Sequence, residues 1–168
     1  LAGNGISVPT VSCHHHSPPS VVAGLVGRLT RGENLALVTD AGTPGVSDPG
    51  GVLVAAAAAA GITIVAVPGP SAVAAALSVA GFPANRFLFL GYPPHKKGRL
   101  TFFREAAACP YTVVLYESTH RILKTLAELS SAAPNRALVV CRELTKQFET
   151  TYRGSAAEVT IQLQATSL

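Results

Sequence analysis

The chain has 168 residues, of which 48% are hydrophobic and 13% are charged, and its formal net charge is +4. This length fits one full domain or two small ones, and no apolar run reaches the ~20 residues that span a bilayer. The scattered, odd set of cysteines (Cys13, Cys109 and Cys141) argues against a disulfide framework and favours a reducing compartment. The mild positive charge permits an anionic partner.

The first half of the chain alternates predicted helices and strands. Ser17 is expected to cap a helix that begins at Pro18. The elements that follow are a strand over 35–39, a glycine-rich loop over 40–50, a helix over 52–60, a strand over 62–67 and a helix over 71–80. Glycines at 61 and 81 stand where helices commonly end. This alternation predicts βαβ units and a parallel sheet.

The second half changes character after Gly81, and this break predicts two domains, residues 1–81 and 82–168. Its apolar runs and helical spacings predict strands over 86–91, 111–116 and 137–141, and helices over 100–108 and 118–130. A weak alternation over 147–153 predicts an exposed strand.

Two loops rich in glycine and proline, 40–50 and 68–72, follow predicted strands. Open α/β sheets bind ligands at the carboxyl ends of their strands. Glycines let a ligand approach the backbone, and a following helix offers free N–H groups. The same spacing also fits two tight connections without a ligand. Neither the dinucleotide fingerprint nor the P-loop sequence is present.

Two polar segments are candidate binding sites. The run from Cys13 to His16 contains metal-ligating side chains, but adjacent residues cannot easily face one ion. We therefore favour a polar stretch ahead of a helix and expect no metal. The basic run from His95 to Arg99 has aromatic neighbours at 92 and 102–103. That combination suits RNA phosphates and bases, and it equally fits a solvated loop.

Five segments in order resemble one family closely. They are V-T-D-A-G-T-P-G-V-S-D-P-G, V-P-G-P-S-A-V, F-L-F-L-G-Y-P-P-H-K-K-G-R, V-V-L-Y-E-S-T-H-R and C-R-E-L-T-K-Q-F-E. Together they resemble the ribosomal RNA small-subunit methyltransferase I family, within the tetrapyrrole-methylase-like superfamily. The resemblance covers residues 17–158.

The resemblance implies an α/β fold of two α/β domains, with S-adenosylmethionine (SAM) bound in the cleft between them. It implies methyl transfer from SAM to the ribose 2′-oxygen of a cytidine in small-subunit, 16S-type rRNA. It also implies a homodimer that acts on the 30S-type subunit. The expected location is the cytoplasm, or an organelle if the source is eukaryotic.

Carried over by motif, the resemblance also implies site residues. The expected cofactor contacts are Asp40, Ala41, Gly42, Ser47, Ser71, Ala72, Tyr116 and Arg142. The expected RNA-phosphate contacts are Lys96, Lys97 and Arg99. The candidates for the base that removes the hydroxyl proton are Glu117, Glu143 and Lys146.

This sequence departs from the family pattern at both ends. The family's opening strand, its A-T-P-I-G-N-L-x-D loop and its E-D-T-R segment have no counterpart before Ser17, so we expect the first domain to lack its N-terminal strand. The tail over 160–168 stops short of the family's closing helix and strand. Two alternatives stay open: a catalytically inactive fragment that binds RNA or a partner, and a methylase of tetrapyrroles such as precorrins.

Overall fold

The computed structural model describes residues 2–14 and 16–166. It forms two compact units, of which the first ends at Pro70 and the second begins at Ser71. The predicted α/β class is confirmed, since the chain combines helices with parallel and antiparallel strands. Among the described residues, no helix has the length and apolarity needed to cross a membrane.

The first unit is built from short helices and extended segments. A 3-10 turn, η1 (Ala2–Asn4), precedes the helices α1 (Pro19–Thr30) and α2 (Gly51–Ala59). The N-cap of α1 is Pro18, not the predicted Ser17, because the Ser17 hydroxyl instead accepts a hydrogen bond from the His14 N–H (2.8 Å). The helices α1 and α2 pack against each other.

The two strands predicted for this unit, over 35–39 and 62–67, do not form. Both segments are extended, but the described part of the unit contains no strand ladder. A strand needs a neighbour to receive its backbone hydrogen bonds and cover its side chains. Without one, Val38, Val65 and Val67 are 61%, 77% and 85% exposed. The predicted parallel sheet of this unit is therefore wrong.

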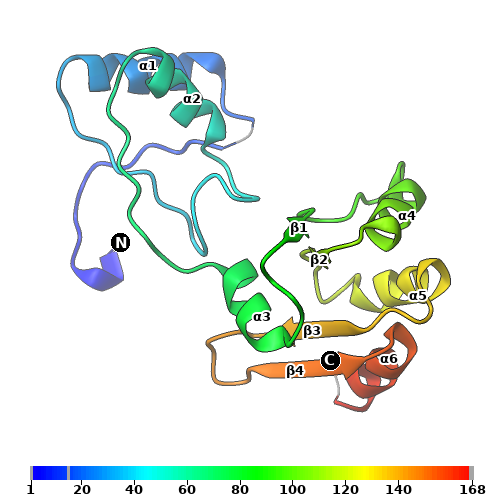
Figure 1. Cartoon of the computed structure of the whole chain (residues 1–168). Coiled ribbons are helices and arrows are strands. Elements are labelled where there is room, and N and C mark those ends of the chain that lie inside the picture. Colours follow the sequence, from blue (N-terminus) through cyan, green and yellow to red (C-terminus); the bar gives the residue numbers. More distant parts are fainter. Residues whose placement is uncertain (1, 15, 167–168) are drawn as a thin grey trace. The chain divides into compact units, whose positions relative to one another are not determined.

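The second unit contains two short ladders and most of the helices (Figure 1). Strand β1 (Phe87–Phe89) pairs in parallel with β2 (Thr112–Val114), and β3 (Leu138–Arg142) pairs antiparallel with β4 (Thr150–Gly154). The helices are α3 (Ala72–Ala80), α4 (Arg99–Ala108), α5 (Ile122–Ala132) and α6 (Ala156–Ala165). Apart from α6, these elements match the predicted ones with shifted or shortened ends.

Helix α3 accounts for the difference between the predicted boundary after Gly81 and the observed division after Pro70. It packs within the second unit, where the Arg153 guanidinium donates a hydrogen bond to the Val79 carbonyl. Ala76, Leu77 and Ala80 of α3 line the same cavity as β2 and β3. Its N-cap is Ser71, whose hydroxyl accepts from the Ala74 N–H (3.3 Å).

The core of the second unit lies between α5, α6 and the β3–β4 ladder. Its buried members are Leu126, Tyr152, Ala156, Val159 and Leu163. Helix α6 supplies three of these five side chains, although the sequence analysis did not predict it. The signal was present, because Ser155 and Glu158 form a capping box, which marks a helix start.

Candidate functional site

The first glycine-rich loop, over 40–50, is hydrogen-bonded to the second, over 68–72, at Pro70. The Thr43 hydroxyl donates a hydrogen bond to the Pro70 carbonyl (2.9 Å). Within the first loop, the Gly45 N–H donates to the Pro49 carbonyl (3.2 Å). The Thr43–Pro70 hydrogen bond thus connects the first loop with the part of the second loop that lies in the first unit.

Four predicted cofactor contacts lie in this loop, at Asp40, Ala41, Gly42 and Ser47, and all four residues are exposed. Ser47 has a φ of 55°, a conformation that is uncommon for any residue other than glycine. Backbone held in this region of φ tends to occur at functional sites.

A second group of predicted residues lines a cavity of about 800 Å³ within the second unit. Ala72, Tyr116 and Glu117 contribute to its wall. The Tyr116 ring contacts the rings of Phe89 and Tyr92, with centroid separations of 5.0 and 5.4 Å. The structure therefore brings together residues from the second and fourth of the five segments quoted above, along with the aromatic residues of the third.

The residues predicted after β3 form a separate group in the second unit. Arg142 and Glu143 line a smaller cavity of about 450 Å³, together with the exposed Phe148. The Glu143 carboxylate pairs with the Lys146 ammonium at 3.2 Å. Glu143 and Thr145 have φ values of 54° and 66°, so this loop, like the one over 40–50, contains residues other than glycine in the left-handed region.

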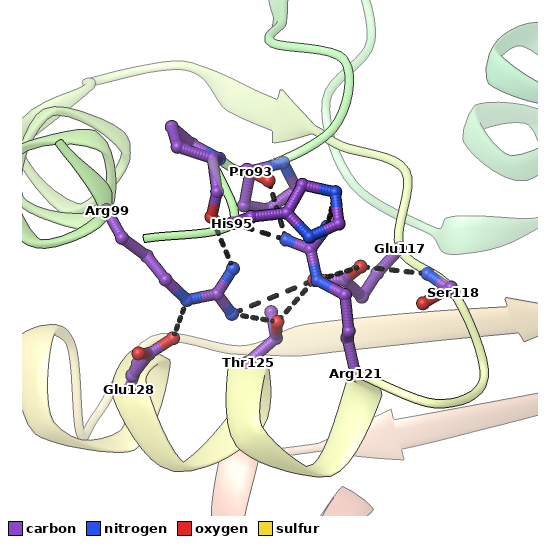
Figure 2. Close-up of polar contacts among 9 residues, drawn as sticks. Pro93, His95, Arg99, Glu117, Ser118, Arg121, Thr125 and Glu128 are labelled. Carbon is purple, nitrogen blue, oxygen red and sulfur yellow. Dashed lines mark hydrogen bonds and ion pairs between the residues drawn. The ribbon is translucent and has the colours of Figure 1, made fainter. Parts of the chain in front are cut away.

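The surroundings of Glu117 do not leave its carboxylate free to act as a base. Its side chain is only 2% exposed, and both oxygens have partners (Figure 2). One oxygen accepts from the Ser118 N–H (2.9 Å) and lies 3.3 Å from the Arg121 guanidinium. The other accepts from the Thr125 hydroxyl and lies 3.8 Å from the Arg99 guanidinium. A carboxylate with two hydrogen-bond donors and two neighbouring guanidinium groups is stabilised in place.

The three predicted RNA contacts differ from one another. Lys96 and Lys97 are exposed, and within the described residues neither pairs with a carboxylate. Arg99 is 6% exposed. Its guanidinium donates to the Glu128 carboxylate (2.6 Å), the Pro94 carbonyl (2.9 Å) and the Thr125 hydroxyl (2.6 Å), as Figure 2 shows. The Arg99 guanidinium is therefore already hydrogen-bonded to partners inside the second unit.

Arg121, Thr125 and Glu128 were not among the predicted site residues, although Arg121 ends the fourth of the five segments. They lie at i, i+4 and i+7 along the start and one face of α5, a spacing that brings side chains to one side of a helix. The sequence signal for this group was a set of polar residues at helical spacing that begins four residues after Glu117.

No group of three or more metal-ligating side chains occurs within residues 2–14 and 16–166. His15, part of the histidine run considered as a metal site, lies outside the described residues.

The chain is similar to curated proteins named ribosomal RNA small subunit methyltransferase I. The identity is 46% to the protein from Xylella fastidiosa (strain Temecula1), over 97% of this chain and 60% of that protein. It is 44% to the protein from Pseudomonas aeruginosa, over 87% and 52%, and 41% to that from Escherichia coli O157:H7, over 92% and 55%. This chain thus spans between about half and three fifths of these relatives' lengths.

The family resemblance drawn from the five segments is confirmed by these similarities. The profile of the tetrapyrrole (corrin/porphyrin) methylases matches residues 9–160, which include every site residue discussed above and both glycine-rich loops. The chain therefore belongs to the tetrapyrrole methylase family.

Proposed function

We propose that the chain takes part in SAM-dependent methylation of small-subunit rRNA, at the ribose 2′-oxygen of a cytidine. The observation that carries this proposal is the identity of 41–46% to the three relatives that share this name, over 87–97% of the chain. The exposed lysines of the loop before α4 add a surface suited to an RNA backbone. A homodimer located with ribosomal subunits in the cytoplasm belongs to the same proposal.

The glycine-rich loops leave steric room for a ligand such as SAM. A Cβ atom built at Gly42 or Gly45 would meet no atom within 4 Å, so a ligand can approach the backbone there. Bound SAM would supply an activated methyl group on sulfur. We propose that Asp40 and Ser47 bind its amino-acid end and that the Ser71 and Ala72 backbone adds contacts.

The protein's contribution to methyl transfer is chiefly orientation and proximity. Among the candidate bases we favour Glu143, which is 39% exposed and lies beside Lys146. Glu117 is committed to internal partners, which favours a positioning role for it. Arg142, the last residue of β3, would then contact the cofactor beside Glu143.

The test begins with SAM binding by calorimetry. We expect binding by the wild-type chain, loss of it in an Asp40→Ala, Ser71→Trp double variant, and retention in Asp48→Ala, which removes a carboxylate of the same loop that we assign no contact. Absence of heat from folded wild-type chain would contradict the cofactor proposal. RNA binding without SAM binding would instead favour the non-catalytic, RNA-binding alternative.

The substrate is tested by incubating the chain with SAM that carries a labelled methyl group. We expect label in rRNA of 30S subunits and, after digestion, in a 2′-O-methylated cytidine. Label in a precorrin-type tetrapyrrole and none in rRNA would favour the tetrapyrrole methylase alternative. A Glu143→Gln variant that binds SAM and RNA but transfers no label would support the role of Glu143.

A further inference from the structure

The loop between β1 and α4 contains two consecutive prolines, Pro93 and Pro94, which have no N–H groups to donate. Their carbonyls are instead bound by two arginines from elsewhere in the second unit. The Arg121 guanidinium donates to the Pro93 carbonyl at 2.6 Å and to the Pro94 carbonyl at 3.4 Å. The Arg99 guanidinium donates to the Pro94 carbonyl at 2.9 Å.

Glu117 lies between these two guanidinium groups (Figure 2). We call Arg99, Glu117 and Arg121 the arginine clamp. Buried charges are tolerated when they are paired and hydrogen-bonded, and here the 2% exposed Glu117 carboxylate pairs with both arginines. Thr125 and Glu128 of α5 complete the hydrogen bonds of Arg99. With Glu128 included, two guanidinium groups meet two carboxylates, so the clamp belongs to a charge-balanced network and is not an isolated ion pair.

The clamp fixes one side of the loop and leaves the other in solvent. Pro93 is among the side chains less than 2% exposed, and the Arg121 guanidinium lies 3.3 Å from the His95 ring nitrogen. The next residues, Lys96 and Lys97, are exposed. Two exposed lysines, which pair with no carboxylate among the described residues, therefore follow a backbone segment that is anchored immediately before them and again at Arg99, the first residue of α4.

We infer that the arginine clamp positions Lys96 and Lys97 for contact with RNA phosphates, so that Arg99, Glu117 and Arg121 are positioning residues for RNA binding. This inference rests on the proposed RNA binding by the two lysines. Holding a loop in its binding conformation lowers the entropy lost when a ligand binds. Arg99 thereby acts through the loop backbone and not as a phosphate ligand.

The first test changes the net charge of the clamp and asks whether RNA binding becomes stronger or weaker. Glu117→Gln makes the site more positive, so simple electrostatic attraction would strengthen RNA binding. The clamp predicts the opposite, because the arginines lose their shared anion and the loop loses its anchor. We expect affinity for a fluorescein-labelled single-stranded RNA, measured by anisotropy, to fall by several-fold to about tenfold. Equal or tighter binding by a folded Glu117→Gln protein would overturn the inference.

The second test keeps the charge constant, in case Glu117→Gln does not fold. Arg121→Lys retains a cation but not the guanidinium fork that reaches two carbonyls and a carboxylate. We expect it to weaken RNA binding, whereas Arg104→Lys, at an exposed position on α4, serves as the matched control and should not. Wild-type affinity for Arg121→Lys would overturn the clamp.

A double-mutant cycle then separates this inference from the proposed function. Lys96→Ala with Lys97→Ala should weaken binding and lower the salt dependence by about 0.7 per lost phosphate contact. In that background Arg121→Lys should have no further effect, because the clamp acts through the lysines. An additive effect would overturn the inference while leaving the lysines as RNA contacts. Unchanged binding by the lysine variant would overturn both the lysine contacts and their positioning.

Discussion

The two units of the chain differ in what their apolar residues achieve. In the second unit, Leu126, Val159 and Leu163 are at most 1% exposed at the centre of a core between helices and a strand ladder. In the first unit, Val65 and Val67 are 77% and 85% exposed, although their segment has the β-branched residues of a strand. Apolar composition is thus not sufficient for a core.

The two units differ in whether their extended segments pair into strand ladders. Strands β3 and β4 pair over five residues each, and their side chains then form a surface on which α5 and α6 pack. The segments over 35–39 and 62–67 have no ladder in the described structure, and the helix beside them, α2, is largely alanine. Alanine buries little area per residue.

The largest expected effect compares one substitution in both units. Leu126→Ala removes a side chain that is 1% exposed at the core of the second unit. We expect it to lower the free energy of unfolding by about 2–5 kcal/mol, the usual range for a buried leucine. Leu25→Ala in α1, at 8% exposure, should cost clearly less because Leu25 does not belong to the buried cluster around Leu126.

Urea unfolding followed by circular dichroism measures both variants. Hydrogen exchange resolved by segment assigns each loss to its unit. Equal costs for the two leucines would mean that the first unit is as tightly packed as the second, and would remove the contrast.

A smaller effect is expected within the first unit, at the end of the glycine-rich loop. Gly50 has a φ of 129°, and a Cβ atom there would lie 2.6 Å from a methyl carbon of Leu37. Gly50→Ala should therefore cost about 1–3 kcal/mol. Gly51→Ala is the matched control, since its Cβ would meet nothing within 4 Å and alanine favours helix α2.

Thermal unfolding of the two alanine variants, read by segment-resolved hydrogen exchange, provides the measurement. If Gly50→Ala were as stable as Gly51→Ala, the loop would not hold residue 50 at its positive φ. The first unit would then be looser than its helices suggest.

The sequence predicted helices better than it predicted the sheet. Helix ends are marked locally, as at Gly81, which ends α3 as expected, and at Ser71, which is the N-cap of α3 and not, as predicted, its first helical residue. A ladder depends on a partner distant in sequence, and nothing within 35–39 or 62–67 states whether that partner is present. Helix α6 was not predicted, although its Ser155–Glu158 capping box is a local mark of a helix start.

The site shows the same division between local and distant information. The motifs correctly predicted that Lys96 and Lys97 lie in an exposed loop. They did not separate them from Arg99, which belongs to the same basic run but is 6% exposed. Its partners Glu117, Thr125 and Glu128 come from another strand end and helix, so only the folded structure distinguishes a free cation from a buried one.

A third comparison sets exposed against packed valines. Val65→Thr and Val67→Thr should each change stability by no more than about 0.5 kcal/mol, as surface substitutions do. Val140→Thr in β3, which is partly buried against the core of the second unit, should cost more because a hydroxyl replaces a packed methyl group. Urea midpoints give the ranking. A large loss at Val65 or Val67 would show that these side chains are covered in solution.

The smallest expected effect is a pH dependence confined to the second unit. The Ser155 backbone N–H donates to the Glu158 carboxylate (2.7 Å), and this bond, with help from the Ser155 hydroxyl, lowers the pKa of Glu158 below its usual 4.5. Since the folded pKa is depressed, the carboxylate contributes stability above the unfolded pKa and loses it as pH falls through the folded value. Glu158→Gln should therefore be less stable than wild type at pH ~6 and approach it at pH ~3. Urea unfolding at the two pH values measures this difference. A stability difference that stays constant with pH would contradict this prediction. It would mean that the pKa of Glu158 is the same in the folded and the unfolded chain.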